Sequence, residues 1–170
     1  LDFDQMELRA TSQITQDDHM LSVYASGSDL HMATAKGVAG RDDIDPDGPE
    51  RQLAKALNFG LLYGSGAATF ADQAFAGYGI DLTVDEATVH RDRFFETYPG
   101  LRRWQSQQAH NSRRIGYAET LCGRRWLWAW ERFVGDDPEP DGFRYTLSLN
   151  VPVQGTCAEI VQLSIGWVEP

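Results

Sequence analysis

The segment at residues 50–63 (ERQLAKALNFGLLY) is the feature that most constrains how this chain can fold. An α-helix turns by about 100° per residue, so Arg51, Lys55, Phe59 and Tyr63, which are four apart, form one slanted stripe. Small and apolar residues occupy the opposite side: Leu53, Ala56, Leu57, Gly60 and Leu61. A glycine-rich stretch follows and ends the pattern. The segment predicts an amphipathic helix that packs against other elements through its apolar side.

The stripe itself has two interpretations. Two cations followed by two aromatic rings suit a ligand with phosphates at one end and a flat base at the other. A solvated amphipathic helix that carries aromatic residues by chance has the same pattern. The helix alone does not separate these alternatives.

Start and stop signals elsewhere predict an α+β chain that is mostly helical. Ser28 or Asp29 is placed to cap one helix, and Thr83-x-x-Glu86 forms a capping box for another. A strand is expected within Leu1–Arg9, where apolar and polar residues alternate. The remaining predicted elements are helices at Glu7–Thr15, Asp17–Ala25, Leu30–Ala39, Ala67–Ala76, Thr83–Tyr98, Pro99–Ile115 and Thr156–Val168, a helical or irregular segment at Arg144–Asn150, and strands at Tyr117–Leu121 and Arg124–Trp130 around Cys122-Gly123.

Length and composition set the class of protein. The chain has 170 residues, 42% of them hydrophobic, which predicts a single domain of ordinary size with its own core. Its two cysteines, Cys122 and Cys157, have no partner spacing, so we expect a reducing compartment. The apolar runs are far shorter than the ~20 residues that span a bilayer, and we expect no leader segment. A soluble, cytoplasmic protein with no membrane partner is expected.

The charge balance is unfavourable for a general nucleic-acid binder, because the formal net charge is −10. Positive charge is nevertheless concentrated between Arg102 and Arg125, which contains six arginines and a single carboxylate. Trp104, Tyr117 and Trp126 are interleaved with these arginines. Basic residues with aromatics can follow a phosphate backbone, but a solvated helix face explains them equally well.

Carboxylates near the start of the chain form a candidate metal site. Asp2 and Asp4 are two apart, so on a strand both point to one face, and their oxygens are the ligands that Mg²⁺ prefers. The alternative is a solvated strand end. Asp43-x-Asp45-x-Asp47 begins like a calcium-binding loop, but Ala54 stands where the bidentate glutamate belongs, which argues against calcium. The four histidines show no metal-ligand spacing.

Several motifs together resemble family A DNA polymerases, the bacterial DNA polymerase I type, with a phage-encoded branch as a plausible source. The motifs cover essentially the whole chain and occur in the family's order. They are Asp2-Phe3-Asp4-Gln5-Met6-Glu7-Leu8-Arg9, Asp29-Leu30-His31, Arg51-x-x-x-Lys55-x-x-Asn58-Phe59-Gly60-x-x-Tyr63-Gly64, Tyr98-Pro99-Gly100, Gly116-Tyr117-x-Glu119-Thr120-x-x-Gly123-Arg124-Arg125 and Asn150-x-Pro152-x-Gln154-Gly155-Thr156.

The resemblance implies template-directed addition of deoxynucleotides to a primer 3′-OH, in DNA replication or repair, with two Mg²⁺ ions. It makes Asp2 the first catalytic aspartate and a metal ligand beside the Phe3 backbone carbonyl, and Lys55 the group that neutralises or protonates the pyrophosphate leaving group. Glu7 matches the steric gate against a ribose 2′-OH. The other residues implied to bind dNTP are His31, Arg51, Phe59 and Tyr63, and those implied to bind DNA are Asn150 and Gln154.

The resemblance also implies a division of the chain. Residues 1–28 match a palm segment, 29–142 the fingers subdomain of a right-hand polymerase, and 143–170 a return to the palm. The family's third motif, which supplies the second catalytic aspartate, and the thumb are expected to lie outside these residues. We therefore expect the chain alone to be inactive and to work with the remaining palm and the thumb of a parent polymerase, on primer–template DNA and dNTPs. A non-catalytic nucleotide- or DNA-binding module is the alternative, and a helical interaction domain is a third reading.

Overall fold

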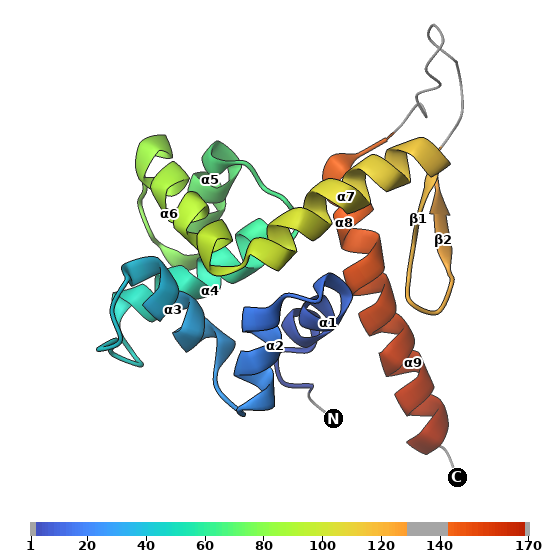
Figure 1. Ribbon diagram of the computed structural model, residues 1–170, viewed down its shortest axis with the longest axis horizontal. Coiled ribbons are helices and arrows are strands. Elements are labelled where there is room, and N and C mark those ends of the chain that lie inside the picture. The colour runs from blue at the N-terminus through green and yellow to red at the C-terminus, as the bar shows by residue number, and fades with distance from the viewer. Residues whose placement is uncertain (1–2, 129–142, 169–170) are drawn as a thin grey trace, which may run out of the picture. The chain divides into compact units, whose positions relative to one another are not determined.

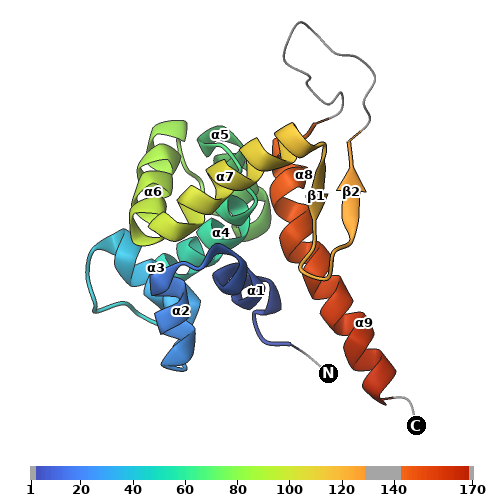
Figure 2. The same ribbon diagram turned by 45° about the vertical axis from the view of Figure 1, so that its right-hand side comes forward.

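The computed structural model describes residues 3–128 and 143–168 (Figures 1 and 2). It contains two compact units rather than one. Unit 1 comprises Leu1–Ile14 and Arg103–Pro170, and unit 2 comprises Thr15–Arg102. The division into palm and fingers segments after residues 28 and 142 stays a prediction.

Unit 2 is helical throughout its regular elements. It contains α2 (Asp18–Ala25), α3 (Leu30–Ala39), α4 (Pro49–Leu62), α5 (Ala67–Tyr78), α6 (Val84–Thr97) and the beginning of α7 (Pro99–Ile115). Helix α3 packs on α4 and α6, and α5 packs on α4 and α6, as both views show (Figures 1 and 2). The core between them is fully buried: Leu30, Leu57, Leu61, Phe70, Phe94, Tyr98 and Leu101.

Side-chain caps explain where these helices begin. The Asp29 carboxylate accepts a hydrogen bond from the His31 N–H and caps α3. Thr83 and Glu86 form the expected capping box at the start of α6. Such caps satisfy N–H groups that have no partner inside the helix. The helices therefore begin within one or two residues of the positions that the sequence predicts.

One buried carboxylate, Asp17, caps two helices. Its Oδ1 accepts hydrogen bonds from the N–H groups of His19 and Met20 in α2, at 3.1 and 3.0 Å. Its Oδ2 accepts from the N–H groups of Gly100 and Leu101 in α7, at 2.7 and 3.2 Å. A Cβ on Gly100 would lie 2.7 Å from the Asp17 Cα, so glycine permits this close approach. Asp17 thus stabilises the beginnings of both α2 and α7.

Unit 1 combines helices with a small hairpin. It contains α1 (Met6–Thr15) up to Ile14, the rest of α7, β1 (Tyr117–Glu119), β2 (Arg125–Leu127), α8 (Tyr145–Asn150), the π-helix η1 (Val151–Gly155) and α9 (Thr156–Val168). The strands are antiparallel, with Ala118 opposite Trp126. Buried apolar side chains hold this unit together: Leu8, Ala118, Trp128, Leu149 and Val153.

The π-helix was not predicted, and Pro152 explains it. Proline has no N–H, so it cannot donate to the carbonyl of Ser148 four residues earlier. The Gln108 side chain from α7 donates its Nε2–H to that carbonyl instead, at 3.3 Å. The Thr156 hydroxyl in turn donates to the carbonyl of Pro152. Side chains therefore satisfy backbone groups at a turn where the helix changes its hydrogen-bond register.

The strand expected within Leu1–Arg9 is wrong for the residues that the structure describes. Residues 3–5 form an irregular turn, with a positive φ of 50° at Gln5, and α1 begins at Met6. A strand needs a neighbour to share its backbone hydrogen bonds, and the described strands β1 and β2 pair with each other. Leu1 and Asp2 lie outside the described residues. The two later strands are confirmed but shorter than predicted, and Trp130 also lies outside.

None of the helices formed by residues 3–128 and 143–168 is long and apolar enough to cross a membrane.

Candidate functional site

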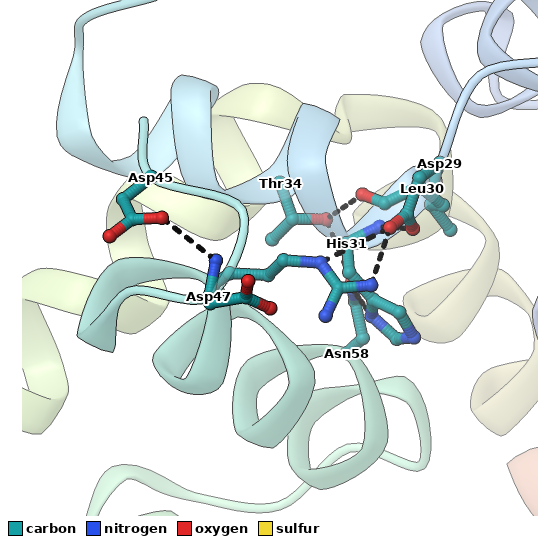
Figure 3. Close-up of polar contacts among 8 residues, drawn as sticks. Asp29, Leu30, His31, Thr34, Asp45, Asp47 and Asn58 are labelled. Atoms are coloured by element: carbon teal, nitrogen blue, oxygen red, sulfur yellow. Dashed lines mark hydrogen bonds and ion pairs between the residues drawn. The ribbon is translucent and has the colours of Figure 1, made fainter. Parts of the chain in front are cut away.

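An ion pair links the start of α3 to α4 in unit 2. The Arg51 guanidinium donates to Asp29 Oδ2 from Nη2 at 2.7 Å and from Nε at 3.2 Å. Asp29 is labelled at the start of α3 in Figure 3. About a quarter of each side chain is exposed, 25% for Arg51 and 29% for Asp29. Burial raises the pKa of Asp29, whereas the hydrogen bonds from Arg51 and from the His31 backbone N–H lower it. The lowering effects are together larger, so the pKa lies below its ordinary value. Arg51 is therefore half-buried and paired with a carboxylate.

A buried polar network lies beside this ion pair. Asn58 Nδ2 is 2.8 Å from His31 Nδ1, and Asn58 Oδ1 is 3.0 Å from the Thr34 hydroxyl (Figure 3). The Tyr98 hydroxyl is 2.8 Å from the same Thr34 oxygen. All four side chains are buried, and burial raises the pKa of Tyr98 far above its ordinary value. Because the Tyr98 hydroxyl stays protonated, it joins Thr34 and Asn58 as a neutral member of this network.

The sequence did not identify Asn58 as a site residue. The feature of the sequence that could have identified Asn58 is its helical position, because it shares the buried side of α4 with Ala54, Leu57, Leu61 and Leu62. A polar side chain on that side needs a partner inside the protein. His31, predicted to bind phosphate, is also buried, with 6% of its surface exposed. The structure thus joins one predicted residue to one that was missed.

The remaining stripe residues follow α4 towards its end. Lys55 is half-buried, and no carboxylate lies within ion-pair distance of it in the described part of the chain. Phe59 is 42% exposed, and its ring centroid lies 5.9 Å from that of His31. Tyr63 is half-buried and follows the last residue of the helix. The predicted stripe is confirmed as a row on α4, but only Phe59 among its members is exposed.

Two other predicted residues meet inside unit 1. Glu7 lies in the first turn of α1, and Gln154 lies in the π-helix. Gln154 Nε2 donates to Glu7 Oε1 at 3.4 Å, although the two are 147 residues apart in sequence. Asn150, the third predicted residue of this unit, is half-buried at the end of α8. Glu7, Asn150 and Gln154 therefore share a unit, and Glu7 and Gln154 are in direct contact.

The described residues do not build a metal site. Asp2 lies outside them, and Phe3 is exposed. The Asp4 carboxylate lies 3.4 Å from the Arg9 guanidinium, and its side chain is 76% exposed. Within residues 3–128 and 143–168, no three His, Cys, Asp or Glu side chains come together to hold a metal ion. The metal ligands Asp2 and Phe3 stay predictions.

A second buried carboxylate lies on α9 in unit 1. Glu159 Oε1 accepts a hydrogen bond from the Thr120 hydroxyl at 2.9 Å and pairs with Arg124 Nε at 3.3 Å. Its Oε2 is buried without a partner among the described residues. The hydrogen bond to Glu159 raises the pKa of the exposed Cys122 thiol. This cluster fixes the hairpin turn to α9 and lies outside the predicted site residues.

Comparisons with known proteins place this geometry in a family. The sequence matches DNA polymerase family A over residues 1–169. It is 34% identical to DNA polymerase I of Aquifex aeolicus over 166 residues, which is 96% of this chain and 26% of that protein. It is 33% identical to the thermostable DNA polymerase I of Thermus aquaticus over 171 residues, 97% of this chain and 19% of that protein. The chain thus spans about a fifth to a quarter of the length of these relatives.

A solved structure has the same fold. It is the POL domain of Pol1 from M. smegmatis in complex with DNA primer-template and dNTP. The TM-score is 0.76 at 26% sequence identity, and the match covers 94% of this chain and 27% of that one. The family match extends over nearly every residue and agrees with the motifs that α3 and α4 carry. The chain belongs to DNA polymerase family A.

Proposed function

We propose that this chain is the part of a DNA-directed DNA polymerase that binds the incoming deoxynucleoside triphosphate. One observation carries the proposal: the fold brings His31 on α3 together with Arg51, Asn58 and Phe59 on α4. These residues include two polar groups that can bind phosphate and a ring that can lie against a sugar or base. The polymerase relative of known structure is a complex with primer-template and dNTP, which supports the same ligand.

The cations of α4 differ in what they can offer a triphosphate. The Arg51 guanidinium already spends two N–H groups on Asp29, so it binds phosphate only with the donors that remain. Lys55 has no such carboxylate among the described residues, so its full charge is available. We assign Lys55 to the triphosphate and to the pyrophosphate leaving group, whose developing negative charge a fixed cation stabilises.

The aromatic and acidic residues set the shape of the site. The exposed Phe59 ring is placed to contact the sugar or base, with Tyr63 following it at the end of α4. Glu7, held by the Gln154 amide, is proposed to exclude a ribose 2′-OH. A gate of this kind selects by removing the space that the extra hydroxyl needs. Asn150 and Gln154 are proposed to contact the primer–template duplex.

Family A DNA polymerases generally use divalent metal ions. We propose two Mg²⁺ ions here, with Asp2 and the Phe3 carbonyl as ligands. Bound ions of this kind stabilise the attacking and leaving oxygens of an in-line displacement. The described residues build no metal site. The proposed roles of Lys55 and Arg51 at the triphosphate and of Glu7 at the sugar depend on the charges and positions of these side chains and not on a bound metal.

Titration of the 170-residue chain with dGTP and Mg²⁺ at low salt tests the proposal. Lys55→Ala removes one charge-assisted contact, worth about 1.5–3 kcal/mol, so its affinity falls roughly ten- to a hundredfold. The chain's only other lysine, Lys36, provides the matched control, because it lies on α3 with Asp42 at 3.7 Å. Lys36→Ala is expected to change the affinity less than about threefold.

Two results would contradict the proposal. One is the absence of dGTP binding by wild-type chain whose far-UV circular dichroism shows a folded helical protein. The other is an equal loss of affinity in the two lysine variants, which would mean that binding follows overall charge rather than the α4 stripe.

A further inference from the structure

The heavy-atom positions in the network around His31 are compatible with two arrangements of the hydrogen-bonding protons. The Thr34 hydroxyl has one proton and three neighbours: the Leu30 carbonyl at 2.9 Å, Asn58 Oδ1 at 3.0 Å and the Tyr98 hydroxyl at 2.8 Å. Tyr98 can donate to Thr34, so Thr34 must donate either to Asn58 or to Leu30. The Asn58 amide links Thr34 to His31, with its oxygen at one end and its NH₂ group at the other. Its orientation therefore determines whether His31 Nδ1 carries a proton.

In the first arrangement Thr34 donates to Asn58 Oδ1. Asn58 Nδ2 then donates to His31 Nδ1, which has to be an unprotonated acceptor, and the ring proton of the neutral imidazole lies on Nε2. In the second arrangement Thr34 donates to Leu30, and the Asn58 amide is turned over. Its oxygen then faces His31 Nδ1, which has to carry a proton.

Backbone hydrogen bonding favours the first arrangement. Leu30 is the first residue of α3, so the N–H of Thr34, four residues on, already donates to its carbonyl. The structure also places Asn58 Oδ1 at the Thr34 hydroxyl and Asn58 Nδ2 at His31 Nδ1, which is the amide orientation of the first arrangement. In this orientation Asn58 Oδ1 needs the Thr34 proton, whereas the Leu30 carbonyl already has a backbone donor.

We propose that Asn58 is a positioning residue that fixes His31 as a neutral imidazole with its proton on Nε2. Thr34 and Tyr98 hold the Asn58 amide in the orientation that this requires. The purpose rests on the proposed function: Nε2–H is then a hydrogen-bond donor for a phosphate oxygen, and its orientation is set before the ligand binds. Two charged groups of the described residues lie near His31: Asp29, whose carboxylate accepts a hydrogen bond from the His31 backbone N–H, and Arg51, which pairs with Asp29.

The positions of the ring protons can be read directly. Two-bond ¹H–¹⁵N spectra of the chain labelled at histidine distinguish an imidazole protonated on Nε2 from one protonated on Nδ1. At pH 8, His31 of the wild type is expected to show the Nε2–H pattern. Asn58→Asp places an acceptor-only carboxylate at Nδ1, so His31 is expected to show a protonated Nδ1. Thr34→Val removes the hydroxyl that orients the amide, and the single pattern is expected to become a mixture.

A wild-type Nδ1–H pattern would overturn the proposal without any variant, so it stays testable even where Asn58→Asp fails to fold. An unchanged pattern in folded Asn58→Asp would overturn it as well. The link to phosphate is tested separately by dGTP titration at pH 8, where Asn58→Asp is expected to bind about tenfold more weakly, because an Nε2 lone pair then faces the phosphate. If the wild type binds no dGTP, the proposed function fails while the spectra still decide the role of Asn58.

Discussion

Replacement of Asp17 by alanine is expected to be the most damaging polar substitution in unit 2. Four backbone N–H groups would lose their acceptor at once, two in α2 and two in α7. Loss of a helix N-cap costs about 1 kcal/mol. The N–H groups of Gly100 and Leu101 are buried, and each buried donor left without a partner costs about 1–3 kcal/mol. The free energy of unfolding should therefore fall by about 3–7 kcal/mol.

Asp17→Asn provides an intermediate case. Its one amide oxygen can serve one helix, while its NH₂ group faces the N–H donors of the other, so we expect about half the loss, roughly 2 kcal/mol. Urea unfolding followed by circular dichroism measures these differences, and the alanine variant should also melt roughly 10 °C lower. Thr83→Ala, which removes the solvent-exposed cap of α6, is the control. If Asp17→Ala lost no more stability than Thr83→Ala, the argument from two shared helix ends would be refuted.

Three other predictions concern single sites. Burial, with a nearby guanidinium, lowers the pKa of His90 below 6.5 in the folded chain, so the unfolded chain binds the proton more readily. The contribution of His90 to the free energy of unfolding should be fully present above pH 6.5 and fall as the pH drops through the lowered pKa. His90→Gln should reduce the dependence of the free energy of unfolding on pH, measured by urea titration. Gly60→Ala would place a Cβ 2.8 Å from a buried phenyl ring and should cost about 1–3 kcal/mol, whereas Gly77→Ala, with open space around it, should stabilise by about 0.5–1 kcal/mol in the same denaturation assay. Because Glu159 raises the pKa of Cys122, Glu159→Gln should speed alkylation of this exposed thiol at pH 8, and an unchanged rate would contradict the assigned contact.

The helices could be predicted from the sequence because their signals are local. Asp29 and the pair Thr83 and Glu86 act within one turn of the helices that they cap, so their side chains and the pattern that follows are enough. The row on α4 follows from the helical repeat in the same way. The family assignment rested on several such local motifs occurring in one order, and it was confirmed over residues 1–169.

The errors arose where partners lie far apart in the sequence. The alternation in Leu1–Arg9 predicts a strand only if a neighbouring strand pairs with it, and residues 3–5 have none among the described strands. The π-helix depends on Gln108 reaching a carbonyl 40 residues away. Asn58 differs again, because its position was readable but its partners, Thr34 and His31, are 24 and 27 residues away. Helical periodicity predicts which side of a helix a residue lies on, but the residues that pack against that side are known only from the fold.

Asp29 shows how the fold changes the meaning of the α4 stripe. From the helix alone, Arg51 and Lys55 are equivalent cations one turn apart. The fold gives Arg51 a carboxylate that also caps α3, so a phosphate at Arg51 must share the guanidinium with Asp29. Removing Arg51 would take the guanidinium away from that half-buried carboxylate. Lys55 has no such structural duty among the described residues. Substitution of Arg51 therefore mixes a loss of fold with a loss of ligand, whereas substitution of Lys55 reports on the ligand, which is why the binding test is placed on the lysine.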